Sequence, residues 1–211
     1  SQLNNWLRPK KVDPSLIMLG TKTRIMMEAK GACLIMAPWN YPFNLTLGPL
    51  VSAVAAGNTV ILKPSEMSLA TSKLISRLVK ELFPENEAAV LLGGLELGKE
   101  LLEQPFDHIF FTGIPRVGNI FMGSAAKNLP WFTIELGGKS PTIIDQTADL
   151  KDAAKKIAWG KSLNCGQTCI APDHLYVHAS KYDQFIELFK KYTNQYFNEN
   201  NEGLINSKHY A

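Results

Sequence analysis

Residues 32–42 read Ala-Cys-Leu-Ile-Met-Ala-Pro-Trp-Asn-Tyr-Pro, five apolar residues followed by a turn rich in proline. An apolar run of this length bounded by turn residues predicts a buried strand over 32–36. The next segment, 45–56, has leucines and valines at helical spacing and stops before Gly57, which predicts a helix ended by glycine. Pro49 lies inside that helix and should kink it or confine its regular hydrogen bonds to the part after the proline.

The same alternation of strand and helix continues to residue 135. Further strands are predicted over 59–62, 88–92, 108–112 and 131–135, and further helices over 69–83, 95–102 and 115–126. Strands separated by helices of this length form βαβ units, and hence a parallel sheet covered on both faces. The sequence therefore predicts an α/β fold built on a Rossmann-like, doubly wound parallel sheet.

After Gly138 the pattern changes. Strands are predicted over 142–145 and 174–177, helices over 149–161 and 181–197, and a polar linker over 198–203. Three helix caps are expected: Ser68, Asp149, and a capping box formed by Ser180 with Asp183. Two strands and two helices are too few for a sheet with protected edges, so 138–211 should be the first part of a second α/β domain. The expected divisions are 1–30, 31–137 and 138–211.

The composition is that of a soluble globular protein: 45% of the 211 residues are hydrophobic, 19% are charged, and the net charge is +3. The basic residues are scattered rather than gathered into the stripe that nucleic-acid binding requires. No apolar run approaches the ~18 residues that span a bilayer, and no secretory signal is visible. We therefore expect neither a nucleic acid nor a membrane as partner. Three cysteines are too few for a disulfide framework, which favours a reduced, cytoplasmic setting.

The strongest candidate for chemistry is Cys169, in Asn164-Cys165-Gly166-Gln167-Thr168-Cys169. A single cysteine is more often a small buried apolar residue. The polar neighbours here instead favour a loop with an accessible thiol. Zinc is a weak alternative because Cys165, Cys169 and His174 supply at most three ligands, so we expect no metal.

Two further side chains could act together with a thiol. Glu135 ends the predicted strand 131–135, where α/β sheets place functional groups, and partial burial would raise its pKa and suit it to a general base. An exposed carboxylate at a strand end is an equally good interpretation. Asn40 lies in the turn after the first strand, where it could be a simple turn residue or donate its amide hydrogen bond to an oxyanion.

A phosphate site is suggested by residues 110–118, which predict a strand, a glycine turn and the start of a helix. That geometry aims backbone N–H groups at an anion, although two glycines at this spacing are weak evidence alone. Lys63 and Glu66 follow the strand 59–62. They could hold ribose hydroxyls, or they could be solvated loop charges.

Taken together, these segments resemble the aldehyde dehydrogenase superfamily. Five motifs occur in that family's order: Pro38-Trp39-Asn40-Tyr41-Pro42-Phe43, Leu62-Lys63-Pro64-Ser65-Glu66, Phe111-Thr112-Gly113, Glu135-Leu136-Gly137-Gly138-Lys139-Ser140-Pro141 and Gly166-Gln167-Thr168-Cys169. Glu135 and Cys169 are 34 positions apart, which is the family's spacing. The segments 39–44 and 167–173 are most similar to the class 3 branch, which acts on medium-chain and aromatic aldehydes.

The resemblance implies a division of roles. Cys169 would be the nucleophile, Glu135 the general base and Asn40 a donor to the oxyanion. The cofactor would be NAD or NADP, and its implied contacts are Pro38, Trp39, Lys63, Glu66, Gly113, Gly118, Leu136 and Gly137. Ile114 departs from the family pattern, since many members have serine or asparagine there. We therefore expect the loss of one polar phosphate contact and weaker, but not abolished, cofactor binding.

The resemblance also implies a reaction, the oxidation of a small aldehyde to a carboxylic acid through a thiohemiacetal and a thioester. Residues 31–137 would bind the dinucleotide, 138–211 would carry the nucleophile, and 1–30 would contain the hairpin of a homodimer. Family members are about twice as long, so we expect a truncated chain with little turnover by itself. Two alternatives remain: a dinucleotide-binding fragment without catalysis, and a dehydrogenase that acylates coenzyme A.

Overall fold

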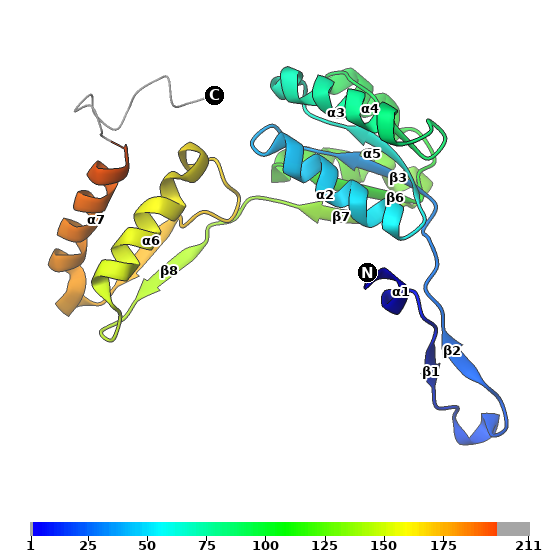
Figure 1. Cartoon of the computed structure of the whole chain (residues 1–211), viewed down its shortest axis with the longest axis horizontal. Coiled ribbons are helices and arrows are strands. Elements are labelled where there is room, and N and C mark those ends of the chain that lie inside the picture. The colour runs from blue at the N-terminus through cyan, green and yellow to red at the C-terminus, as the bar shows by residue number, and fades with distance from the viewer. Residues whose placement is uncertain (1, 198–211) are drawn as a thin grey trace. The chain divides into compact units, whose positions relative to one another are not determined.

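The computed structural model describes residues 2–197, which divide into two compact units between Glu135 and Leu136 (Figure 1). In the first unit, five parallel strands form one sheet in the order β5–β4–β3–β6–β7. These strands are β3 (Ala32–Met36), β4 (Thr59–Lys63), β5 (Ala88–Val90), β6 (His108–Thr112) and β7 (Trp131–Glu135). The predicted doubly wound sheet is confirmed, and its strand order reverses between β3 and β6.

Two layers of helices cover the sheet of the first unit (Figure 1). Leu50 of α2 (Pro42–Ala55) and Ile75 of α3 (Leu69–Leu82) share a core cluster with Cys33 and Ile35 of β3. On the opposite face, α4 (Leu95–Leu102) and α5 (Pro115–Ala125) pack against alternate residues of the same strand, Leu34 and Met36. Successive side chains of a strand point to opposite faces, so one apolar run serves both clusters.

Helix α2 begins three residues earlier than the sequence predicts, with Pro42 in its first turn. Proline is well suited to that position because the first N–H groups of a helix have no partner inside the helix. Pro49 lies within the helix without ending it, so the helix is not confined to the part after Pro49; the alternative, a kink at Pro49, stays a prediction. Gly57 follows the helix with φ +85°, in the left-handed region that glycine adopts at least cost.

Of the three predicted caps, one is confirmed. Asp149 accepts hydrogen bonds from the N–H groups of Lys151 and Asp152 at the start of α6 (Leu150–Ser162). Ser68 precedes α3 but makes no capping bond, because its hydroxyl donates to the carbonyl of Trp39 instead. The Ser180 prediction is also wrong, since α7 (Tyr182–Phe197) follows a short 3₁₀ turn whose N-cap is His178.

The second unit is small. Its strands β8 (Pro141–Ile144) and β9 (His174–Val177) pair in parallel, and α6 and α7 cover one face of them. The core consists of side chains from all four elements, among them Ile144, Ile157, Val177 and Phe185. The linker predicted over 198–203 lies outside the described residues.

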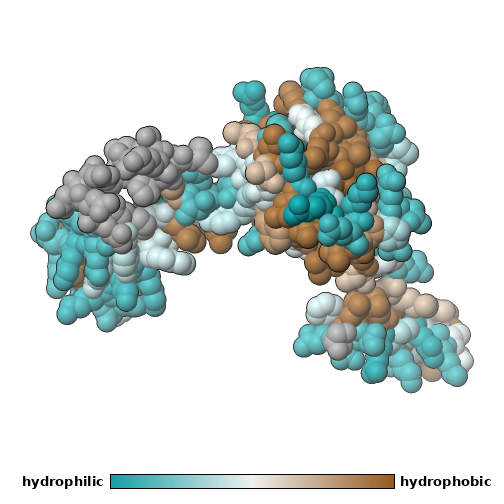
Figure 2. Space-filling model, turned by 45° about the horizontal axis from the view of Figure 1, so that its top comes forward, coloured by the Kyte–Doolittle hydropathy of each residue, from teal (hydrophilic) through white to brown (hydrophobic). Residues whose placement is uncertain are grey.

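The N-terminal segment forms a short helix, α1 (Leu3–Trp6), and an antiparallel hairpin of β1 (Lys10–Val12) and β2 (Thr23–Ile25). Apolar and hydrophilic side chains are mixed on the surface of this segment (Figure 2). Leu16 and Ile17, in the connection between the strands, are almost fully exposed. Within residues 2–197, no helix combines the length and the apolar character that crossing a bilayer requires.

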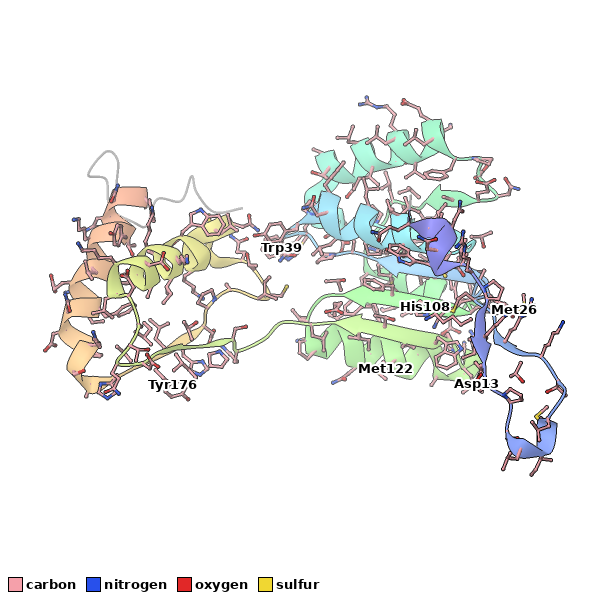
Figure 3. All side chains as sticks on the ribbon, turned by 60° about the horizontal axis from the view of Figure 1, so that its bottom comes forward. Asp13, Met26, Trp39, His108, Met122 and Tyr176 are labelled. Carbon is pink, nitrogen blue, oxygen red and sulfur yellow. The ribbon has the colours of Figure 1, made fainter. Side chains whose placement is uncertain are left out.

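A cavity of about 350 Å³ lies at the amino ends of β3 and β6, lined by Lys30, Cys33, His108, Phe110 and neighbouring residues. Figure 3 places His108 at this end of the sheet and Trp39 at the other. The Nε2 of His108 is 3.2 Å from the hydroxyl of Thr133, whereas its buried Nδ1 has no hydrogen-bond partner in the described structure. Burial, and then the Lys30 ammonium, lower the pKa of His108.

This lowered pKa predicts an acid-dependent loss of stability. The folded state favours the neutral imidazole, so stability is highest above the unfolded pKa of about 6.5 and falls as the pH drops through it. We expect the fall in urea midpoint between about pH 7.5 and 5.5 to be smaller in His108→Gln than in the wild type. An equal fall in both proteins would contradict the assignment; His174→Gln, in the second unit, is the control.

Candidate active site

Most of the residues proposed from the sequence to bind a cofactor gather at one edge of the first unit's sheet. Because the strands are parallel, their carboxyl ends share this edge: Met36 pairs with both Lys63 and Phe111, and Thr112 pairs with Glu135. Pro38, Trp39 and Asn40 follow β3, Lys63 ends β4, Gly113 follows β6 and Glu135 ends β7. Ligands of doubly wound sheets bind at this edge, where the strand order reverses.

Hydrogen bonds tie the first two of these loops together. The N–H of Ala37 donates to the carbonyl of Lys63 at 3.1 Å, and the Ser68 hydroxyl donates to the carbonyl of Trp39 at 3.0 Å. Trp39 and Asn40 are half-buried. The turn that carries Asn40 is therefore held by the loop after β4, a role of Ser68 that its local sequence does not reveal.

Lys63 and Glu66 form an ion pair, with 3.1 Å between Nζ and Oε2. Lys63 is buried beneath α4, since a Cβ on Gly98 would lie 3.7 Å from the Lys63 Cε, whereas Glu66 is exposed. Burial alone would raise the pKa of Glu66, but its own backbone N–H and the Lys63 ammonium outweigh that effect and lower it. The carboxylate therefore stays ionised and can accept hydrogen bonds from hydroxyl groups.

The turn into α5 explains why residue 113 is glycine. A Cβ there would collide with the ring of Phe111, and the Gly113 N–H donates to the carbonyl of Glu135 at 3.0 Å. Ile114 is exposed at the N-cap and offers no side-chain cap. Gly118 is buried within α5 and its N–H donates to the carbonyl of Ile114, so that N–H is used inside the helix.

Glu135 is exposed at the end of β7. Of the two interpretations offered by the sequence, the structure agrees with the exposed carboxylate at a strand end and not with the partly buried one. The reason is that its predecessor Ile134 packs against the α4–α5 side of the sheet, whereas the alternating side chain of Glu135 does not.

Cys169 belongs to the second unit, in the loop that joins α6 to β9. Asn164, Cys165 and Gly166 are all left-handed there, with φ of +52°, +55° and +77°. The N–H of Ala171 donates to the carbonyl of Thr168 at 3.1 Å, which closes a turn around Cys169. The half-buried Cys169 is a free thiol on a polar loop, as the sequence predicts.

Leu136 and Gly137, the remaining proposed contacts, are exposed at the start of the second unit. The next residue, Gly138, lies against the Cys169 loop, since a Cβ on it would be 3.5 Å from the Cys169 carbonyl oxygen. Among the described residues, no group of three His, Cys, Asp or Glu side chains could hold a metal ion.

The sequence model of the aldehyde dehydrogenase family matches residues 8–203. The chain belongs to the aldehyde dehydrogenase family. AldX of Bacillus subtilis is 48% identical over 208 residues, which are 99% of this chain and 46% of AldX. Aldehyde dehydrogenase family 3 member A2 of Pongo abelii is 42% identical over 99% of this chain and 44% of its own length, in accord with the predicted class 3 branch. The chain thus spans about half the length of the curated aldehyde dehydrogenases that it matches.

Solved aldehyde dehydrogenases share the fold. The substrate-bound AldH of Staphylococcus aureus superposes with a TM-score of 0.90 at 42% identity, over 99% of this chain and 45% of AldH. AldC of Pseudomonas syringae, a variant solved with NAD⁺ and octanal, has a TM-score of 0.76 at 31% identity, over 80% of this chain and 36% of AldC.

The left-handed run before Cys169 predicts a strong effect of one methyl group. In Gly166→Ala, the new Cβ would lie 3.2 Å from the Lys161 carbonyl, in a conformation that costs L-residues about 1–2 kcal/mol. We expect amide hydrogen exchange over residues 163–170 to become faster. The control, Gly123→Ala, adds a methyl group to open space in α5 and should leave the loop unchanged. Equal exchange in both variants would show that Gly166 does not constrain the loop.

Proposed function

We propose that the protein to which this chain belongs oxidises a small aldehyde to a carboxylic acid with NAD or NADP. The observation that carries the proposal is the gathering of the family's dinucleotide motifs at the carboxyl edge of the sheet, where the strand order reverses. AldC, a structural relative, was solved with NAD⁺ and an aldehyde.

The residues at this edge fit a dinucleotide. The ionised Glu66 beside Lys63 supplies an acceptor and a donor for ribose hydroxyls. The side-chain-free Gly113 opens the approach to the start of α5, whose first N–H groups and positive helix end favour phosphate. Pro38, Trp39, Leu136 and Gly137 would complete the contacts, and Gly118 would keep α5 close to the sheet.

The roles that we assign to Cys169, Asn40 and Glu135 follow from the reactivity of the aldehyde carbonyl. Its carbonyl carbon releases hydride readily only when it is tetrahedral and electron-rich, and attack by the Cys169 thiolate creates that centre. The new oxyanion needs a donor, which we assign to the Asn40 amide. The bound nicotinamide would accept the hydride. Cys169 is then left as a thioester, and Glu135 would take a proton from the water that releases the acid, which favours water over coenzyme A as acceptor.

The exposure of Glu135 suits a base that must reach water.

We further propose that the whole protein is a homodimer that uses the β1–β2 hairpin. Several large apolar side chains in and beside the hairpin are exposed, as is typical of a surface that contacts another protein chain: Leu16, Ile17, Leu19 and Met26.

The Lys63–Glu66 pair gives a direct test of cofactor binding. Lys63→Met removes a charged hydrogen bond of roughly 1.5–3 kcal/mol, so NAD affinity measured by calorimetry should fall about 10- to 100-fold. Lys99→Met is the matched control, because Lys99 makes the same kind of pair with Glu96, at 2.8 Å, on the exposed side of α4. Equal NAD affinities of the Lys63→Met and Lys99→Met variants would show that Lys63 does not bind the cofactor.

Iodoacetamide tests the nucleophile without requiring turnover. We expect Cys169 to be alkylated faster than Cys165 and the rate at Cys169 to change when NAD is added, because an active-site thiol lies beside the cofactor. Peptide mass spectrometry measures both rates in one sample, with the buried Cys33 as an internal reference. Equal labelling of Cys165 and Cys169, insensitive to NAD, would instead support a dinucleotide-binding fragment without catalysis.

A further inference from the structure

The loop that carries Cys169 returns to β9 at Asp173, whose N–H and two carboxylate oxygens all have partners. Its N–H donates to the carbonyl of Ser140 at 3.0 Å. Its Oδ1 is 3.3 Å from the Nζ of Lys139, and its Oδ2 is 3.6 Å from the Nδ1 of His174. The segment after Gly138 and the segment after Cys169 are thus fastened together just before β8 and β9 begin to pair.

The loop between Cys169 and Asp173 also runs close to two glycines. Gly138 lies next to the carbonyl of Cys169, as described above, and the ring of Pro172 lies 3.8 Å from the Cβ position of Gly160 in α6. Ala171, between them, is buried. A displacement of residue 173 would therefore move the backbone of Cys169, since only three residues separate the two.

The charges around Asp173 favour its ion pair with Lys139, which joins the loop after Cys169 to the segment after Gly138. Burial alone would raise the pKa of Asp173, but the Lys139 hydrogen bond and charge, the His174 hydrogen bond and the Lys161 charge together lower it. The carboxylate is thus ionised at neutral pH. An exposed ion pair is weak when it must order two free side chains, but here the Ser140–Asp173 backbone bond already places one partner.

We propose that Lys139 and Asp173 are positioning residues for Cys169, and that their ion pair holds the nucleophile's loop closed against residues 138–140. The proposal rests on the proposed function, which makes Cys169 the nucleophile. Neither residue is assigned a contact with the substrate. Their part is to fix where the thiol and the backbone N–H of Cys169 lie.

Hydrogen exchange of the full 211-residue chain tests the ion pair. In Lys139→Met and Asp173→Asn, we expect the amides of residues 166–171 to exchange about three- to fivefold faster. Lys139→Arg keeps the charge and should return the rates to within about twofold of the wild type. A role of the Lys139 side chain that did not depend on its charge would not single out Lys139→Arg in this way.

Salt provides an independent electrostatic readout. Raising NaCl to about 0.5 M should accelerate loop exchange in the wild type toward the Lys139→Met rate and leave Lys139→Met unchanged. Lys156→Met is the control, because it removes another ion pair of the same unit, with Asp152 at 2.7 Å on α6, and should not alter the loop. Unchanged exchange in Lys139→Met and Asp173→Asn, or salt effects equal in the wild type and Lys139→Met, would overturn the proposal.

Alkylation separates this inference from the proposed function. If the pair positions Cys169, the ratio of Cys169 to Cys165 alkylation rates should shift by about threefold in Lys139→Met and be restored in Lys139→Arg. A constant ratio would overturn the positioning role. A wild-type Cys169 that reacts no faster than Cys165 would count against the proposed function, whatever the exchange rates show.

Discussion

The parallel pairing of β3 with β4 on one side and β6 on the other is the constraint on which the first unit depends. It requires β3 to be buried on both faces, which its unbroken apolar run allows. It also brings the carboxyl ends of β3, β4, β6 and β7 to a single edge. Short polar segments that lie far apart in the sequence, around Asn40, Lys63, Gly113 and Glu135, become neighbours for that reason alone.

Apolar periodicity was sufficient to predict the five strands of the first unit's sheet and the helices that cover it, because each element buries its apolar residues at its own spacing. The N-terminal hairpin, whose strands are mostly exposed, was implied only by the resemblance. The missed cap at Ser68 lies where a side chain had a choice of partner. The Ser68 hydroxyl bonds to the Trp39 carbonyl, 29 positions away, rather than capping its own helix. The Asp149 carboxylate instead accepts from N–H groups at the start of α6 and caps that helix as expected. The sequence around Ser68 therefore does not tell whether its hydroxyl caps the helix or bonds to a carbonyl far away in the chain.

The candidate site was predictable in its members but not in its geometry. Cys169 was recognisable from its polar neighbours, whereas the left-handed φ of Cys165 carries no sequence signal and that of Asn164 only the weak preference of asparagine for this region. The pairing of Lys139 with Asp173 joins residues 34 positions apart and depends on the register of β8 with β9. Likewise, the sequence left open whether Glu135 is partly buried or exposed, and the strand's alternation, which places it on the other side from Ile134, decides for exposure.

Among residues 136–197, polar contacts carry much of the order of the loop around Cys169. The two strands of the second unit pack Ile144, Leu175 and Val177 against α6 and α7, whereas Ile143 is exposed, as is Tyr176, which Figure 3 labels. A two-stranded sheet gains little stability by itself, and the core is shared among only four elements. The loop from residue 163 to 173 contributes just one well-buried apolar side chain, that of Ala171. Its conformation must therefore come from backbone hydrogen bonds, from the glycine at 166 and from charge, and these interactions act on the few residues nearest the thiol.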